Sequence, residues 1–203
     1  ELLLICERAS ASGQAFVAAL NASAASSDQP NAQFRFAEHH MTLTDERLIT
    51  TIIQRAQADS PPQFRVREAT MADLDALTAI TASAFGEPLD STQRRITQDF
   101  LSGERWLIGL LGDEALGSLR ATPMSTAADT KEREAGIYGF GVLRTRQGQG
   151  WGRRTLAQTL AMLRDEGYAR FSLEVETNNE AAFALYRSCG FVMATTYEYY
   201  ALT

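Results

Sequence analysis

The chain has 203 residues, of which 45% are hydrophobic and 22% are charged, a composition typical of a globular protein rather than a disordered or collagen-like one. Its formal net charge of −6 argues against non-specific binding to nucleic acid or to an anionic membrane, and no apolar run reaches the roughly 20 residues of a membrane-spanning helix. Two distant cysteines and two adjacent histidines give neither metal-ligand spacing nor a disulfide framework, so we predict no metal site and a cytoplasmic location.

The first part of the chain ends at the paired prolines Pro61 and Pro62, which can continue neither a helix nor a central strand. We therefore predict a boundary between residues 1–63 and residues 64–203. Before this boundary, the pattern of apolar residues predicts a strand, a helix, a strand and a second helix, at Leu2–Cys6, Ser12–Leu20, Phe34–Leu43 and Asp45–Gln57.

The second part, residues 64–203, has the pattern of a mixed α/β sheet domain. A capping box at Thr70–Asp73 should open its first helix, and Asp90 should open its second. Strands are expected at Phe64–Glu68, Trp106–Leu111, Ala115–Ala121, Ile137–Leu143, Phe171–Glu176 and Phe191–Leu202. Two further helices are expected. The first should carry Leu156, Leu160 and Leu163 on one face, and the second should span Asn179–Ser188.

A glycine-rich segment, Gln147–Gly152, falls between a predicted strand and a predicted helix. Glycines let backbone N–H groups point outward, and the next helix adds unpaired first-turn donors and the positive end of its dipole. This combination favours phosphate, although a tight turn without a ligand is an alternative. The nucleotide motifs do not fit, because the third small residue of a Rossmann fingerprint would fall on Arg153 and a P-loop lysine is missing.

The spacing Gln-x-x-Gly-x-Gly, formed by Gln147, Gly150 and Gly152, resembles the pyrophosphate loop of the GNAT superfamily of acetyl-CoA-dependent N-acetyltransferases. A second segment is similar to another GNAT element and comprises Asn179, Ala182, Leu185, Tyr186, Gly190 and Phe191. The resemblance covers about residues 64–203. It implies a GNAT-type α/β fold: a mixed, mostly antiparallel sheet with flanking helices, splayed between its fourth and fifth strands, preceded here by a strand-helix-strand extension.

The resemblance also implies acetyl-CoA as cosubstrate, without a metal. Val142 and Leu143 would offer backbone groups to the pantetheine arm, and Asn179 would bond the pantetheine amides, cap its helix, or do both. Some of the arginines near the loop would face the 3′-phosphate, and we include Arg153 in the predicted site. The pyrophosphate would be held by the amides of Gln147, Gly148, Gln149, Gly150, Trp151 and Gly152.

Two residues are the predicted catalytic groups. The strand around Glu174 and the tyrosine twelve residues later, Tyr186, resemble the base and the acid of the ribosomal-protein-alanine N-acetyltransferases within the superfamily. An exposed strand glutamate and a packed aromatic ring are the alternative interpretations. Other members place the base on the fourth strand, at the position of Gly136 here, so Glu134 two residues earlier is the alternative base.

The predicted function is transfer of an acetyl group from acetyl-CoA to a primary amine by direct attack in a ternary complex. The alternative is a non-catalytic acyl-CoA-binding sensor or interaction module. The partner would be a protein N-terminus or a small amine, with no nucleic acid or membrane partner. Tyr197, Tyr199 and Tyr200 would either line the acceptor groove or pack in the sheet.

The first 63 residues repeat the strand-helix-strand order that ends the chain. An offset of 167 aligns Glu7 with Glu174 and Phe16 with Phe183. This favours the C-terminal half of an upstream, degenerate GNAT copy, as in tandem proteins such as the mycothiol synthases. Such a copy would be catalytically silent, because Ala19 stands where Tyr186 would be. The alternative is an unrelated extension that covers a sheet edge or mediates homodimer formation.

Overall fold

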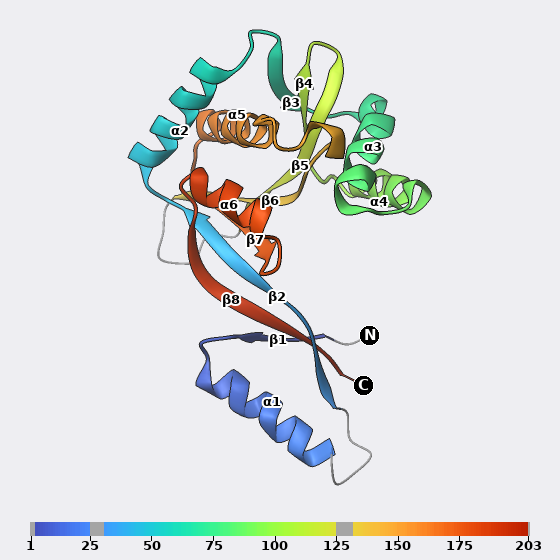
Figure 1. Ribbon diagram of the computed structural model, residues 1–203, viewed down its shortest axis with the longest axis vertical. Coiled ribbons are helices and arrows are strands. Elements are labelled where there is room, and N and C mark those ends of the chain that lie inside the picture. The colour runs from blue at the N-terminus through green and yellow to red at the C-terminus, as the bar shows by residue number, and fades with distance from the viewer. Residues whose placement is uncertain (1–2, 25–30, 125–131, 203) are drawn as a thin grey trace. The chain divides into compact units, whose positions relative to one another are not determined.

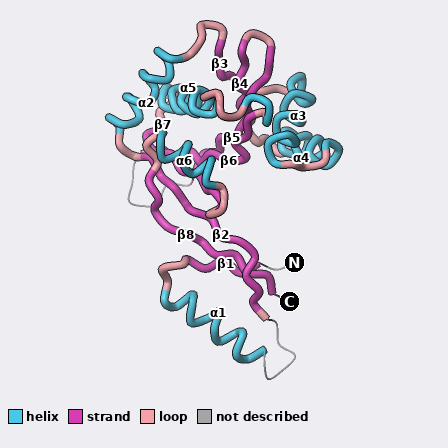
Figure 2. Tube along the Cα trace, viewed as in Figure 1, coloured by secondary structure: helices cyan, strands magenta, loops and turns pink. Residues whose placement is uncertain are grey.

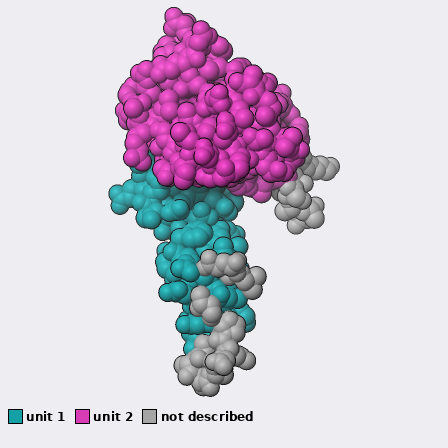
Figure 3. Space-filling view, turned by 90° about the vertical axis from the view of Figure 1, so that its right-hand side faces the viewer, with its two compact units in different colours: residues 1–42, 173–203 teal, residues 43–172 magenta. Residues whose placement is uncertain are grey.

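The structure is a computed structural model that describes residues 3–24, 31–124 and 132–202. The chain divides into two compact units (Figure 3). Unit 1 comprises residues 1–42 and 173–203, and unit 2 comprises residues 43–172. Strand β7, Tyr168–Glu176, begins in unit 2 and ends in unit 1. The domain boundary that the paired prolines indicate, at residue 63, stays a prediction.

Unit 2 is built on an antiparallel sheet of strands β3 to β6, in the order β6-β5-β4-β3 (Figure 1). Figure 2 distinguishes these strands from the helices of the unit. Its elements are α2 (Glu46–Asp59), β3 (Phe64–Glu68), α3 (Leu74–Phe85), α4 (Leu89–Leu101), β4 (Trp106–Leu111), β5 (Glu114–Met124), β6 (Arg133–Val142) and α5 (Trp151–Asp165).

Helices cover both faces of this sheet. Strand β4 is an apolar run buried on both sides, and its residues Trp106, Ile108 and Leu110 form one core cluster with the apolar faces of α3 and α4. On β5, Gly117 approaches Thr155 of α5, where an added Cβ would lie 3.2 Å from the threonine Oγ1. The next residue of β5 pairs with Gly141, where an added Cβ would lie 2.8 Å from Cβ of a residue in α3. Since neighbouring residues of a strand face opposite sides, α3 and α5 lie on opposite faces.

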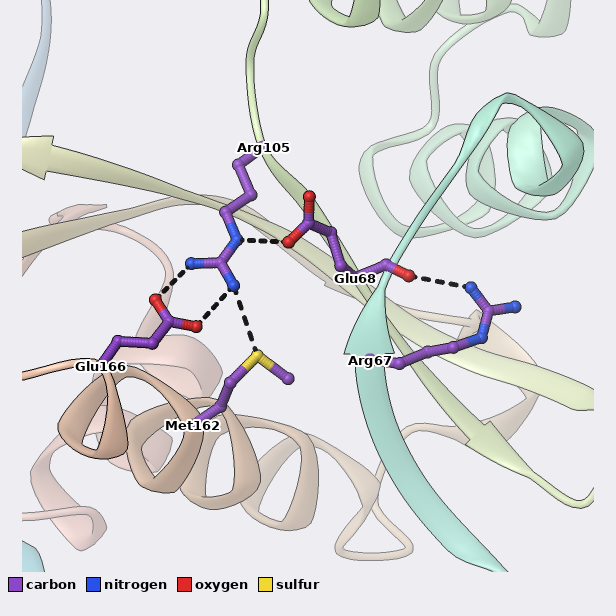
Figure 4. Close-up of polar contacts among 5 residues, drawn as sticks. All are labelled: Arg67, Glu68, Arg105, Met162 and Glu166. Atoms are coloured by element: carbon purple, nitrogen blue, oxygen red, sulfur yellow. Dashed lines mark hydrogen bonds and ion pairs between the residues drawn. The ribbon is translucent and has the colours of Figure 1, made fainter.

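A polar cluster fixes the C-terminal end of α5 against the strands (Figure 4). The Arg105 guanidinium donates two hydrogen bonds of 2.7 Å to the Glu166 carboxylate and one of 3.0 Å to Glu68. It also lies 3.7 Å from the sulfur of Met162. Because a bidentate arginine–carboxylate pair is directional, the cluster sets the orientation of α5, whose other end adjoins the glycine-rich loop.

Unit 1 contains the last four residues of β7 and the two ends of the chain. Its strands lie in the order β1-β8-β2-β7. The other elements are β1 (Leu3–Glu7), α1 (Ala11–Ala24), β2 (Ala32–Leu43, of which Leu43 belongs to unit 2), α6 (Glu180–Ser188) and β8 (Val192–Leu202). Helix α1 covers one face, where Val17 joins a small core with Cys6, Ala32 and Tyr200.

The structure confirms the predicted mixed α/β, mostly antiparallel class and the order of elements. The capping box is present, since the Thr70 N–H donates to the Asp73 carboxylate at 2.9 Å. The expected start of the second helix at Asp90 is wrong: the helix begins at Leu89, with Pro88 as its N-cap, because the fixed φ of proline suits that position. The first residue of the predicted N-terminal strand, Leu2, lies outside the described residues.

Candidate functional site

The loop after β6 adopts a conformation that requires glycine. Gly148 has a φ of 72° and Gly150 a φ of 82°, both in the left-handed region where a side chain is strained. Between β6 and the loop, Arg144–Arg146 form one turn of 3-10 helix. The predicted segment Gln147–Gly152 is therefore a sharp turn into α5.

Backbone donors are available where the loop becomes α5. Gly150 is the N-cap of this helix, and no side chain caps it. The N–H groups of Trp151, Gly152 and Arg153 have no partner within the helix, because the first intrahelical bond joins the Arg154 N–H to the Gly150 carbonyl. Within the described ranges, no other residue accepts a hydrogen bond from these three groups. Together with the helix dipole, these three donors are able to hydrogen-bond to an anion such as a pyrophosphate.

The side chains of the two glutamines in the loop stabilise its conformation through hydrogen bonds to backbone carbonyls. The Gln147 side chain donates to the Val142 carbonyl at 3.0 Å, and the Gln149 side chain donates to the Thr145 carbonyl at 3.0 Å. Both side chains therefore tie the loop to the backbone just before it, at the end of β6 and in the 3-10 turn. Their contribution to an anion site is the shape of the turn rather than a direct side-chain contact.

Some of the backbone groups at the end of β6 are already hydrogen-bonded to β5. The Leu143 N–H donates to the Leu116 carbonyl and the Leu143 carbonyl accepts from Arg146, so both of its polar groups are occupied. Val142 pairs with Gly117 at the adjacent position. At such a position of an antiparallel pair, the backbone N–H and C=O groups point away from the partner strand. Of the two predicted pantetheine contacts, Val142 is the one whose N–H is directed away from β5.

Four arginines lie beside or within the glycine-rich loop and the start of α5, and they differ in the contacts that their side chains make: Arg144, Arg146, Arg153 and Arg154. Arg146 binds the Glu114 carboxylate at 2.7 Å, and Arg154 donates to the Asp59 and Gln149 carbonyls. Arg144 and Arg153 are exposed, and in the described part of the chain neither side chain has a hydrogen-bonding or ion-pairing partner. These two are the arginines able to meet a phosphate without breaking an existing contact.

The side chain of Trp151 packs against neighbouring residues of unit 2 rather than lying open to a ligand. Its ring packs on Phe64 with centroids 5.4 Å apart and lies 4.9 Å from the Arg154 guanidinium. Only its backbone N–H belongs to the candidate anion site.

The packing of unit 2 explains two glycines of β6 and shows the contact made by the alternative base Glu134. Gly141 lies against α3, which leaves no room for a side chain. Gly139 has a φ of 56° and lies at a bulge in the pairing of β6 with β5. The alternative base Glu134 lies 3.7 Å from the Arg170 guanidinium, at the far end of β6 from the loop.

In unit 1, Glu174 lies on β7 with its side chain 37% exposed. The flanking residues Leu173 and Val175 are buried, so the strand alternates and the carboxylate is on the open face. The Nδ1 atom of His40 lies 4.0 Å from the Glu174 carboxylate. Glu174 is therefore accessible, as a general base has to be.

Tyr186 lies on the inner face of α6 and is only 6% exposed. Its ring is 6.2 Å from that of Phe191. Burial, followed by the nearby Cys189, raises the pKa of the Tyr186 phenol above its ordinary value. The phenol therefore holds its proton at neutral pH, the state that a general acid requires.

Asn179 caps α6, since its side-chain oxygen accepts from the Ala182 N–H at 3.1 Å. The amide nitrogen of the same side chain has two further donors that this cap does not use. The helix-capping interpretation is thus confirmed, and the predicted pantetheine contact stays a prediction.

The tyrosines of β8 face both sides of the sheet. Tyr200 is buried in the core under α1, which excludes it from an open groove. Tyr199 is half-buried on the other face, where its ring stacks on Phe36 at 4.4 Å. Burial and a hydrogen bond to Glu38 raise the pKa of Tyr199.

Two side chains near Glu174 were not among the predicted site residues. Glu38 and His40 come from β2, in the N-terminal part of the chain. The alternation of the predicted strand Phe34–Leu43 already places both on one face. Nothing in the sequence indicates that this strand lies beside β7, so their proximity to Glu174 follows only from the folded chain.

No group of three or more histidine, cysteine, aspartate or glutamate side chains is placed to hold a metal ion in the ranges that the structure covers. Among the helices of those ranges, none has both the length and the apolar character that crossing a membrane demands.

Comparison with known proteins gives a family match. The model of the Acetyltransferase (GNAT) family matches residues 74–191, more than half of the chain. No curated protein matches in sequence.

Several solved structures are similar in fold. A GNAT-family acetyltransferase from Colwellia psychrerythraea has a TM-score of 0.63 and 16% identity, over 97% of this chain and 63% of that one. A GCN5-related N-acetyltransferase from Sphaerobacter thermophilus has a TM-score of 0.62 and 17% identity, over 98% and 58%. An aminoglycoside N-acetyltransferase in complex with CoA has a TM-score of 0.54 and 13% identity, over 66% and 91%. The chain thus spans about three fifths of the length of the Colwellia and Sphaerobacter proteins.

Proposed function

The chain belongs to the GNAT family of acetyltransferases, and we propose that it transfers an acetyl group from acetyl-CoA to a primary amine by direct attack in a ternary complex. The observation that carries the proposal is the loop before α5. Its positive-φ glycines and its three uncapped N–H groups suit a pyrophosphate.

The residues of the loop would share the binding of CoA. The N–H groups of Trp151, Gly152 and Arg153 would hold the pyrophosphate, in the turn that Gly148 and Gly150 permit. Gln147 and Gln149 would keep that turn rigid. The Arg153 side chain would meet a phosphate of CoA. Val142, Leu143 and Asn179 stay the proposed contacts of the pantetheine arm.

Two side chains would carry the proton transfers. Acetyl-CoA supplies the acetyl group as an activated thioester. Glu174 takes the proton that the acceptor nitrogen loses as it bonds to the acetyl carbon, directly or through water. Tyr186 gives its proton to the sulfur as the carbon–sulfur bond breaks. A positioned base and a positioned acid each contribute on the order of 10²–10⁴-fold in rate.

The acceptor is proposed as a protein N-terminus or a small amine. The spacing of Glu174 and Tyr186 favours a protein N-terminus. The similarity to an aminoglycoside N-acetyltransferase adds cationic small amines to the candidates. We keep the cytoplasm as the expected compartment, because both cysteines are free thiols buried in the fold.

The proposed domain organisation has residues 64–203 as the catalytic GNAT domain and residues 1–63 as a segment similar to the C-terminal half of another. The order β1-α1-β2 followed much later by β7-α6-β8 supports this repeat. Sheet order supports it as well, because β8 lies between β1 and β2, and β2 lies between β8 and β7.

A binding experiment and a transfer experiment test the proposal together. Thermal unfolding is followed with CoA, acetyl-CoA, NAD and ATP, and thiol release is followed with acetyl-CoA and an amine panel. The panel holds a peptide with a free N-terminal alanine, spermidine and kanamycin. We expect CoA and acetyl-CoA to raise the Tm by several degrees, with an effect that follows ligand concentration. Thiol release should depend on an amine. Stabilisation by CoA without transfer would favour the non-catalytic binding module, and stabilisation by NAD or ATP alone would contradict both.

A further inference from the structure

The N-terminal strand β2 lies between the two last strands of the chain. In unit 1 its neighbours are β8 on one side and β7 on the other. Directly after β7, the Thr177 N–H donates to the Ala37 carbonyl of β2 at 2.9 Å. Three residues after Ala37 comes His40, and three residues before Thr177 comes Glu174, and these two side chains are in contact as well. The two contacts show that β2 and β7 run in opposite directions, so His40 lies opposite Glu174.

The two histidines of the chain point to opposite faces of this sheet. His40 is on the open face, where its Nδ1 atom lies 4.0 Å from the Glu174 carboxylate and both side chains are partly exposed. The preceding residue, His39, is on the face of α6. Its Nδ1 atom is 2.9 Å from the Thr196 hydroxyl, and its ring lies 5.1 Å from that of Phe183. Of the two imidazoles, His40 is therefore the one that meets the proposed base.

Other titratable side chains share the open face with this pair. They come from β2 itself and from both neighbouring strands: Glu38 of β2, Glu176 of β7, and Tyr197 and Tyr199 of β8. Glu38 accepts a hydrogen bond from Tyr199, and the ring of Tyr197 lies 6.3 Å from that of His40. Among the carboxylates of this face, Glu174 is the one within ion-pairing distance of His40.

A carboxylate that acts as a base has to be oriented as well as accessible. A partly exposed glutamate populates several rotamers unless a neighbouring group holds it. An imidazole whose Nδ1–H donates to one carboxylate oxygen leaves the other oxygen for the proton of the acceptor. The distance of 4.0 Å is longer than a hydrogen bond, but contacts of catalytic groups are often long in substrate-free structures and tighten when substrate binds.

We propose that His40 is a positioning residue for the transfer reaction: its Nδ1–H donates to the Glu174 carboxylate and holds it in the orientation in which it accepts the proton of the amine. The inference rests on the proposed function, because it takes Glu174 as the base. The acceptor proton still passes to Glu174, and His40 keeps its own. A strand from the first 63 residues thus becomes part of the catalytic site, a role that a mere cover of a sheet edge would not have.

The first test compares replacements of His40 that keep or remove a donor at the position of Nδ1. The amide nitrogen of asparagine is bonded to Cγ, as Nδ1 is, whereas that of glutamine is one bond farther from the backbone. The full chain is assayed with acetyl-CoA and spermidine, kanamycin and a peptide with a free N-terminal alanine. We expect His40→Ala and His40→Gln to lower kcat about tenfold to hundredfold, with the KM for acetyl-CoA within about twofold of the wild type. His40→Asn should stay within about threefold of the wild-type kcat. The matched control is His39→Ala, on the other face, which should keep the wild-type kcat.

A double variant shows whether His40 acts through Glu174. Residues that act as a unit are not additive, so adding His40→Ala to Glu174→Gln should lower kcat no further than Glu174→Gln alone. A further drop would overturn the inference, because it would indicate a separate, structural effect. A wild-type kcat in His40→Ala, or a loss in His40→Asn as large as in His40→Gln, would overturn it too. If His40→Ala does not fold, His40→Gln takes its place, since it also removes the donor.

A measurement without turnover separates this inference from the proposed function. Nitrogen-15 NMR of the histidine-labelled chain at about pH 8, where an ordinary histidine is neutral, reports which ring nitrogen carries the hydrogen. His39→Ala assigns the signals, because the chain has two histidines. We expect the hydrogen of His40 on Nδ1 in the wild type and on Nε2 in Glu174→Ala, with His39 unchanged. This result supports the inference even if no amine is acetylated, which would by itself count against the proposed function. The same form of His40 in both proteins would overturn the inference.

Discussion

The side-chain amide of Gln147 donates a hydrogen bond to the carbonyl of Val142 over 3.0 Å, which ties the glycine-rich loop to the end of β6. The bond spans five residues and closes the loop on itself. The carbonyl it occupies belongs to the residue whose N–H is directed away from β5. One side chain thus fixes both the turn that exposes the amides and the strand end that the pantetheine arm is expected to meet.

Gly148 has a counterpart elsewhere in unit 2 with the same left-handed backbone conformation. Its φ is 72° and that of Gly86, at the end of α3, is 70°, and an added Cβ meets no atom within 4 Å at either position. Alanine at either site should lower the free energy of unfolding by about 1 kcal/mol, from the positive φ alone. Only Gly148→Ala should weaken CoA binding, because only it deforms the loop. Calorimetric titration with CoA and urea unfolding measure the two effects, and equal CoA affinities would contradict the proposed pyrophosphate site.

Arg153 is exposed and makes no hydrogen bond or ion pair with any residue that the structure describes, whereas Arg146 is paired with Glu114. Replacing Arg153 by glutamine should raise the Kd for CoA about tenfold, the magnitude of one charge-assisted hydrogen bond. The effect should shrink with added salt, since the arginine is open to solvent. Dephospho-CoA should bind both proteins equally if the contact is to the 3′-phosphate. Arg146→Gln is the control, and a larger loss there than at Arg153 would reverse the assignment.

Glu174→Gln removes the proposed base and keeps the size of the side chain. We expect kcat to fall by roughly 10²–10⁴-fold while the Kd for CoA stays within twofold of the wild type. The exposed residue Glu180, in the first turn of α6, provides a control through Glu180→Gln, which should retain activity. Full activity of the Glu174 variant would remove it from the mechanism and return Glu134 to consideration.

Tyr186→Phe deletes a buried hydroxyl and keeps the ring that packs near Phe191. A phenol is protonated at neutral pH, and burial raises the pKa of Tyr186 further, so the variant loses a proton donor rather than a charge and kcat should fall by about 10²-fold or more. Tyr168→Phe deletes the hydroxyl of another tyrosine that is also 6% exposed, and should leave kcat unchanged. Rates are compared under saturating substrates, and equal rates in the two variants would argue against an acid role for Tyr186.

Asp73 makes the stability of the chain sensitive to acid. Hydrogen bonds from Arg67 at 2.7 and 2.8 Å, and then from the Thr70 N–H, lower the pKa of Asp73 to about 2. Because the folded value lies below the unfolded one, its stabilisation is complete above about pH 4 and is lost as the pH falls toward 2. Asp73→Asn should therefore cost about 1–2 kcal/mol at pH 7 and almost nothing at pH 2. Urea unfolding at both values tests this.

The control for this experiment is Asp113→Asn, at an exposed position in the turn that joins β4 to β5. Its cost should be small and the same at both values of pH. A loss for Asp73→Asn that persists at pH 2 would mean that the carboxylate charge is not what stabilises the start of α3.

Local features were predictable because their causes are local. The capping box at Thr70–Asp73, the strand Phe64–Glu68 and the cap of α6 by Asn179 depend on residues within a few positions of one another. The start of α4 was misplaced, since the conformational constraint of Pro88 outweighed the capping preference of Asp90.

Glycines show the limit of such reasoning. The positive φ of Gly148 and Gly150 agrees with the motif, because a strand-to-helix turn needs it. Gly141 carries a different constraint, the approach of α3 on one face of the sheet. A small residue required by a partner distant in sequence looks the same in the sequence as one required by a ligand.

The sequence by itself determined the family, the phosphate-type loop and the candidate pair Glu174 and Tyr186, because motif spacing and periodicity act over short ranges. It also indicated that the first segment repeats the strand-helix-strand order of the end. Only the tertiary structure decided where that segment goes. Strand pairing is non-local, and the pairing of β2 with β7 and β8 puts Glu38 and His40 beside Glu174 across more than 130 residues of chain.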